Sequence, residues 1–152
     1  MTVWNEYSKL KSVMIGKRFT EDILRDRFKN TTKEKLDAIV KINNETNEDL
    51  DKIQLFLEQE GVRVYRPNLD VYWKLEDKNV TDPGACRDWC FAYGDLIIQT
   101  QVSYHQRRFE YLFWEDTFVD LEKQGKILIQ FPQSLTRSQK KERQFGSNLS
   151  IP

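Results

Sequence analysis

The chain has 152 residues, 24 basic and 24 acidic side chains, a formal net charge of zero and 39% hydrophobic residues. This length predicts one domain with a sizeable core. The balanced charge argues against a dedicated nucleic-acid or membrane-surface binder, which would carry a basic excess. No apolar run approaches the ~20 residues that span a bilayer, and the first residues lack the regions of a secretory signal. We therefore expect a cytoplasmic protein with neither a nucleic-acid nor a membrane partner.

The two cysteines and the single histidine bear on metal and redox chemistry. Cys86, Cys90 and His105 cannot complete a four-ligand zinc site by themselves. The C-x-x-x-C spacing is also one residue longer than the redox C-x-x-C motif. We therefore predict no metal site, no cofactor, and two free, buried thiols in a reducing compartment.

The first half of the chain has the pattern of a strand, a long helix and a strand. Residues 12–16 are a short apolar run closed by glycine, which is typical of a buried strand, and residues 17–30 are expected to form a loop with one or two helical turns. Thr31–Glu34 (TTKE) has the pattern of a capping box, and Gly61 marks the helix end. Apolar, small or amide residues recur in steps of three and four, which predicts one core-facing side: Leu36, Ile39, Val40, Asn43, Thr46, Leu50, Ile53 and Leu57.

Two features qualify this long helix. The polar stretch at residues 43–47 interrupts its apolar side, and a break there stays an open alternative. Its acidic residues are expected to form a solvated face rather than a site, because blocks of like charge are usually solvated: Glu45, Glu48, Asp49 and Asp51.

The second half has the pattern of three strands and a helix. Before it, residues 62–66 alternate like a strand and complete the strand-helix-strand pattern of the first half. Residues 68–83 are expected to form an irregular loop. Short strands at 89–93 and 96–98 flank a turn at Gly94 and Asp95. A helix is expected from about 106 to 124, followed by a strand at 126–131. Alternation of strands and helices predicts the α/β class.

The pair Arg87–Asp88 before the first short strand is the candidate binding site. A carboxylate at the mouth of a hairpin is suited to accept two N–H groups of a planar guanidinium cation. Tyr72, Trp73 and Trp89 are candidates for a wall behind such a cation. Two alternatives stay open, since Arg-Asp pairs are commonly surface ion pairs and large aromatic residues commonly pack in cores.

We interpret two other polar residues near this pair as structural rather than catalytic. Glu110 is expected in the first turn of its helix, where the helix dipole favours a carboxylate. His105 has no identifiable partner, which a general base requires, so we expect a surface or loop role for it.

Five motifs carry a resemblance to a known family. Asn5–Gly16 (NEYSKLKSVMIG) resembles the opening strand of the amidinotransferases, NE(W/Y)DxLxxVxVG, and Gly61–Pro67 (GVRVYRP) is similar to their GVxVxRP. Their Arg-Asp and GxxII motifs are matched by Arg87–Asp88 and Gly94–Ile98 (GDLII), and Arg107–Tyr111 (RRFEY) is similar to their RxxFEY. Order and spacing agree over about residues 4–132. The sequence thus resembles the glycine amidinotransferase-like branch of the guanidino-group-modifying (pentein) superfamily.

The resemblance implies an architecture and a substrate. The family fold is an α/β propeller of five strand-strand-helix-strand modules around a guanidine site. About two modules are expected in residues 1–132, with residues 133–152 as a polar tail or the start of the next module. Asp88 falls on the family's first guanidinium-binding aspartate. Asp88 and Arg87 are therefore the predicted substrate-binding residues, for an arginine-like guanidino small molecule.

The resemblance also implies what this chain lacks. In the family a cysteine attacks the guanidino carbon, an amine leaves, and a second amine takes the amidino group while a histidine moves protons. That cysteine, that histidine and a second aspartate belong to later modules, and Cys86, Cys90 and His105 do not match their places. We therefore predict no catalytic residue here and no catalysis by this chain alone.

Three hypotheses remain. The chain is the N-terminal part of an amidinotransferase that needs the missing C-terminal half, or a non-catalytic guanidinium-binding module. The third is a self-assembling protein whose open sheet edges pair with a partner or a second copy.

Overall fold

The computed structural model describes residues 7–100, 102 and 105–131. The elements of its first half are β1 (Ser12–Met14), α1 (Glu21–Arg27), α2 (Lys33–Gln59), β2 (Arg63–Tyr65) and α3 (Val71–Lys74). Its second half contains the strands β3 (Cys90–Tyr93), β4 (Leu96–Gln99) and β5 (Ile127–Gln130), the helix α4 (Glu115–Lys123), and the 3₁₀ helices η1 (Cys86–Asp88), η2 (His105–Arg107) and η3 (Glu110–Trp114). The predicted boundary at residue 132 and the polar stretch 133–152 lie outside the described residues.

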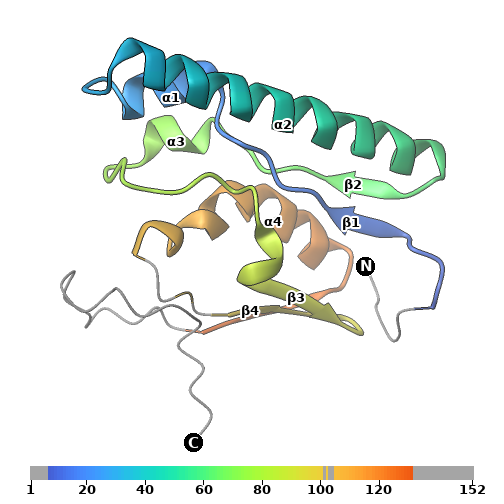
Figure 1. Ribbon diagram of the computed structural model, residues 1–152. Coiled ribbons are helices and arrows are strands. Elements are labelled where there is room, and N and C mark those ends of the chain that lie inside the picture. Colours follow the sequence, from blue (N-terminus) through green and yellow to red (C-terminus); the bar gives the residue numbers. More distant parts are fainter. Residues whose placement is uncertain (1–6, 101, 103–104, 132–152) are drawn as a thin grey trace, which may run out of the picture.

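These elements build two sheets and their covering helices. Strand β1 pairs with β2 in parallel, whereas β4 pairs antiparallel with β3 and parallel with β5. Helix α2 lies along the β1–β2 pair, and α4 lies between that pair and the three-stranded sheet (Figure 1). The α/β class is therefore confirmed, and the predicted strands are all present. The described residues form no closed barrel.

An aromatic core joins the two halves of the chain. The Phe19 ring lies 5.4 Å from that of Tyr72 and 5.9 Å from that of Phe113, measured between centroids. Trp89 packs edge-on against Phe118 at 5.9 Å. These rings come from the segment before α1, from α3, from the start of the β3–β4 hairpin, from η3 and from α4. Burial of such large side chains dominates core energetics, so neither half has a core of its own.

Helix α2 runs unbroken through its polar middle, because two asparagines there bind the segment between β1 and α1. The Asn47 side-chain amide accepts from Arg18 N at 2.8 Å and donates to Arg18 O at 3.1 Å. The buried Asn43 donates to Ile39 O at 2.8 Å and accepts from Arg18 Nε at 3.3 Å. The polar residues that interrupt the apolar side therefore supply the partners of a backbone segment that has no strand neighbour.

The apolar side of α2 is buried only in its first half. Leu36, Val40 and Asn43 are buried, but Ile53 is 49% exposed. The reason is geometric, since a helix of 27 residues is about 40 Å long whereas three-residue strands span about 10 Å. The acidic face is solvated as predicted, with Asp51 reaching Arg66 at 2.9 Å.

Three local predictions are corrected by the structure. The capping box does not form, because the N-cap residue of α2 is Thr32 and no side chain caps it. The loop at 68–83 contains the short helix α3. The helix expected at about 106–124 is α-helical only from residue 115, and η2 and η3 precede it. Short 3₁₀ segments are frequent at the N-termini of α-helices, and apolar periodicity does not distinguish them.

The asparagine contact gives the first prediction. Asn47→Ala should lower the free energy of unfolding by about 1–3 kcal/mol, because it leaves the N–H and C=O of Arg18 without their partner. Urea unfolding followed by circular dichroism measures the change.

The matched control is Asn44→Ala, an exposed residue of the same helix, which should change stability by no more than about 0.5 kcal/mol. Comparing the two variants cancels the higher helix propensity of alanine. Equal effects would show that the Asn47 contact contributes nothing.

Candidate functional site

The predicted site residues lie on η1, which is held against the end of β1. A Cβ on Gly16 would lie 2.2 Å from Gly84 O, so the two backbones touch where β1 ends and the segment leading to η1 begins. Only glycine permits this approach. On the segment that follows, the Asp88 side chain is 40% exposed and that of Arg87 is 92% exposed.

Asp88 is anchored on one side and open on the other. Arg107 Nη1 donates to Asp88 Oδ2 at 2.7 Å. Asp88 Oδ1 lies 3.6 Å from Arg87 Nε, which is longer than a hydrogen bond. Among the described residues, one guanidinium therefore holds the carboxylate in place, and Oδ1 accepts no hydrogen bond.

Arg107 is the centre of this arrangement. Its Nε and Nη2 donate to the two Glu110 oxygens at 2.7 and 3.0 Å, and Nη2 also donates to Ala85 O at 3.1 Å. With the bond to Asp88, these contacts use four of the five N–H groups that a guanidinium offers. Hydrogen bonding to Glu110 raises the pKa of Arg107, so the side chain is a permanent cation.

Glu110 is a buried carboxylate, whereas the sequence predicted a residue stabilised by a helix dipole. It is the first residue of η3 and only 1% exposed, and its Oε1 also accepts the hydroxyl of Thr81. Burial raises the pKa of Glu110, and the contact with Arg107 acts against this rise. The signal that sequence reasoning missed is the spacing of Arg107 and Glu110, since residues three apart face each other on a helical turn.

The aromatic wall predicted behind Asp88 is wrong for two of its three members. Tyr72 and Trp89 are core residues, 0% and 2% exposed, which confirms the packing alternative. Trp73 is 47% exposed, but the Lys78 ammonium already lies 5.4 Å from its ring. Burial, together with a hydrogen bond to Asp26, raises the pKa of Tyr72 to about 12.

Four further candidate residues remain. Asp95 follows the turn glycine Gly94, which has φ 57°, and its Oδ1 lies 2.6 Å from Lys126 Nζ. His105 belongs to η2, but its side chain lies outside the described part of the structure. Cys86 and Cys90 are free thiols and half-buried rather than buried.

Two searches of the described residues found nothing. Across residues 7–100, 102 and 105–131, no three His, Cys, Asp or Glu side chains group as metal ligands would. No helix in the same ranges has both the length and the apolar character needed to cross a membrane.

The buried ion pair gives the second prediction. Glu110→Gln should lower the free energy of unfolding by about 3 kcal/mol, because it leaves the largely enclosed Arg107 cation with only the half-exposed Asp88 as a counter-charge. Glu122→Gln, an exposed carboxylate of α4, is the control and should stay within about 0.5 kcal/mol. Thermal and urea unfolding measure both variants. A neutral effect of Glu110→Gln would show that Arg107 does not need the Glu110 charge.

Comparisons with known proteins find a likeness in structure. No protein-family model and no curated protein matches the sequence. The inosamine-phosphate amidinotransferase of Streptomyces griseus matches 88% of this chain with a TM-score of 0.63 and 19% identity. SxtG, an amidinotransferase of the saxitoxin biosynthetic pathway of Microseira wollei, also matches 88% of it, with a TM-score of 0.65 and 19% identity.

These matches cover most of this chain but less than half of each solved structure. The chain spans 43% of the length of the first amidinotransferase and 42% of the second. The resemblance read from the five motifs is therefore confirmed as a likeness of fold, and this chain has an amidinotransferase fold over less than half the length of those enzymes.

Proposed function

We propose that this chain is the guanidinium-binding part of an amidinotransferase-like protein and that Asp88 binds the guanidino group of an arginine-like substrate. The observation that carries the proposal is the state of Asp88, a partly exposed carboxylate whose Oδ2 is fixed by Arg107 at 2.7 Å. A preoriented carboxylate of this kind is what recognition of a planar cation requires. The shared fold supports the same assignment.

The bond to Arg107 leaves room for a second guanidinium. A carboxylate has about four lone-pair sites on its two oxygens. Arg107 takes one of them on Oδ2, and the 3.6 Å separation from Arg87 leaves Oδ1 available. A substrate guanidinium would approach from the exposed side and donate N–H groups to both carboxylate oxygens. Arg107 would keep its contacts to Glu110 and Ala85.

Arg87 contributes a second point of recognition in this proposal. Its guanidinium is 92% exposed and only 3.6 Å from Asp88. A like charge would repel the guanidino end of the substrate, so Arg87 is better suited to the anionic end, such as the carboxylate of arginine.

The chemistry of transfer needs residues that we do not find in this sequence. In amidinotransferases a cysteine thiolate attacks the guanidino carbon and an amine leaves, and the acceptor amine then takes the amidino group from sulfur. Cys86 and Cys90 do not occupy the nucleophile's place. We therefore propose that the chain supplies about two propeller modules and that a C-terminal half, or a second copy, completes the protein.

The binding site gives the third prediction. Calorimetry should detect arginine binding to the 152-residue chain, and Asp88→Asn should weaken it by at least about tenfold, since a hydrogen bond to a charged group contributes about 1.5–3 kcal/mol. Asp49→Asn, an exposed carboxylate of α2, should leave it unchanged. Arg87→Ala should weaken binding of arginine but not of agmatine, which has the same guanidino group and no carboxylate.

The outcomes separate the two roles. Equal losses for arginine and agmatine in Arg87→Ala would remove the anion-binding role of Arg87 and leave that of Asp88. Absence of binding to a folded chain, or binding that survives Asp88→Asn, would overturn the proposal.

Self-assembly is a second candidate, favoured by the edges of the three-stranded sheet. Within the described residues β3 and β5 are its edge strands. They carry Phe91, Tyr93 and Ile127, which are 49%, 59% and 57% exposed. Exposed apolar edges are templates for pairing.

This candidate gives the fourth prediction. The wild-type chain should sediment as a dimer or larger species at high concentration, and Phe91→Lys should shift it toward monomer because a charged edge resists pairing. A clean wild-type monomer at high concentration would contradict self-assembly.

A further inference from the structure

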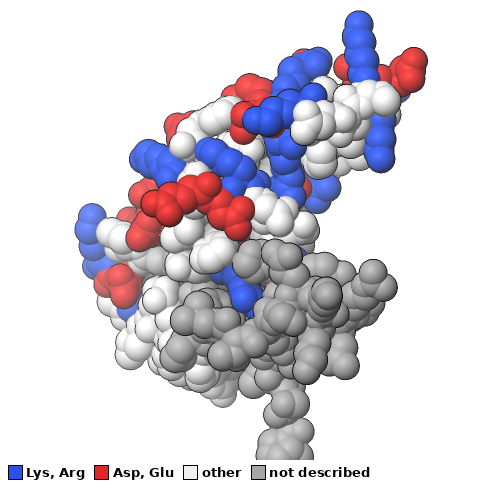
Figure 2. Space-filling view, turned by 90° about the vertical axis from the view of Figure 1, so that its left-hand side faces the viewer, with Lys and Arg blue, Asp and Glu red and all other residues white. Residues whose placement is uncertain are grey.

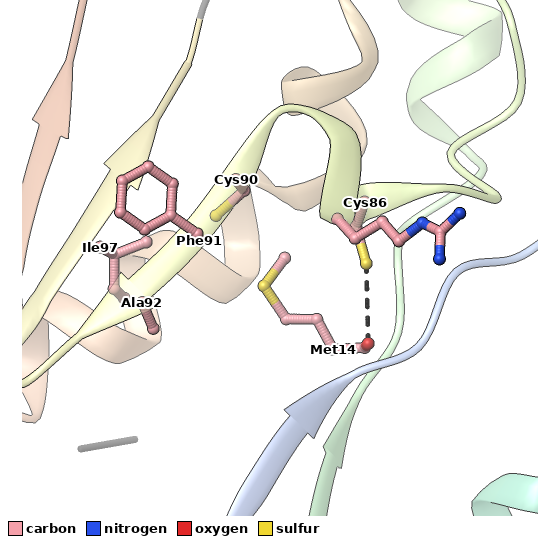
Figure 3. Close-up of a pocket in the computed structure, with 7 residues that line it drawn as sticks. Met14, Cys86, Cys90, Phe91, Ala92 and Ile97 are labelled. Carbon is pink, nitrogen blue, oxygen red and sulfur yellow. Dashed lines mark hydrogen bonds between the residues drawn. The ribbon is translucent and has the colours of Figure 1, made fainter. Parts of the chain in front are cut away.

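Three sulfur-containing side chains from separate elements face one pocket. Met14 comes from β1, Cys86 from η1 and Cys90 from β3, and all three line a cavity of about 170 Å³. Figure 3 shows the thioether of Met14 between the two thiols, with Phe91, Ala92 and Ile97 on the sheet side. The chain contains two methionines and two cysteines, so this pocket gathers most of its sulfur.

The Cys86 sulfur is held there by a contact with the backbone. The Cys86 thiol donates to Met14 O, with 3.6 Å between sulfur and oxygen. This contact holds the Cys86 sulfur beside Met14 of β1, whose own side chain lines the pocket. Both thiols are free, and Cys86 and Cys90 are each half-buried, so neither residue is fully enclosed by the core.

We propose that Met14, Cys86 and Cys90 form a three-coordinate binding site for a soft monovalent cation of the Cu⁺ type. The ligand set is the argument, because thiolate and thioether sulfur select soft ions such as Cu⁺ over the harder divalent metals. A two-thiol, one-thioether site also differs from the four-ligand zinc site that the sequence excludes.

Binding of the metal ion is a ligand exchange and involves no redox step. Each thiol loses its proton to solvent as its sulfur bonds to the metal, so two thiolates and one monovalent cation leave one negative charge. The residues that line the pocket include the cationic Arg87. Burial raises the pKa of both thiols, that of Cys90 to about 12, so the empty site holds neutral thiols and the metal must displace their protons.

Silver(I) is the probe, because Ag⁺ has the same charge and softness as Cu⁺ and is stable in air. The sequence contains an internal reference, since Met1 and Met14 are its two methionines. With ¹³C-methyl-labelled methionine, one equivalent of Ag⁺ should shift the Met14 methyl signal and leave that of Met1 unchanged. Titration against a competing thiol ligand gives the affinity and the stoichiometry.

Variants complete the fifth prediction. Removing a residue that only hydrogen-bonds to a metal ligand weakens metal binding by about 10–100-fold. Cys86→Ser and Cys90→Ser remove ligands themselves, so each should weaken Ag⁺ binding by at least about 100-fold. Met14→Leu, which keeps the volume, should weaken it by a smaller factor. The methyl shift is measured on the wild-type chain, so it stands even where a serine variant does not fold.

Three results would overturn the site. They are an unmoved Met14 methyl signal, two Ag⁺ ions bound with equal and independent affinity, and a folded Cys86→Ser or Cys90→Ser variant that binds as tightly as the wild type.

Discussion

The contact on which the rest of the site depends is the pairing of Arg107 with Glu110. A carboxylate that is 1% exposed cannot keep its charge without a partner, because desolvation of an unpaired ion costs several kcal/mol. Arg107 meets this need with two N–H groups. Its other donors then reach Ala85 O and Asp88 Oδ2, on the segment that carries the candidate binding residue. The arginine that neutralises Glu110 therefore also positions Asp88.

The first half of the chain supports the same segment from the opposite side. Arg18 pairs with Asp82 at 3.1 Å, and Gly16 lies against Gly84. Arg18 is in turn fixed by Asn43 and Asn47 of α2. Helix α2 therefore bears on the site although it contributes no residue to it. A chain without this first half would lose the surface on which residues 82–84 rest.

What the sequence predicted and what it missed have different physical origins. The strands and α2 follow from local apolar runs and a glycine stop, and Gly61 has the positive φ of 75° that this stop requires. The contact of Glu110 with Thr81 and that of Tyr72 with Phe19 join residues far apart in the sequence, so they are set by the tertiary fold. Residues 43–47 looked like a break because their partner, Arg18, is 25 or more residues away. The position of Asp88 was predicted from motifs, but its anchor was not.

The short turn η1 joins the candidate guanidinium site to the sulfur pocket. It has three residues and no side-chain cap, so it is too short to be stable by itself. Contacts from outside hold it at both ends, since Cys86 at its start donates to Met14 O, and Asp88 at its end accepts from Arg107. One contact belongs to β1 and the other to η2. The geometry of Asp88 is therefore set by both halves of the fold at once, since a single turn of backbone connects its contact with Arg107 to the Met14 carbonyl.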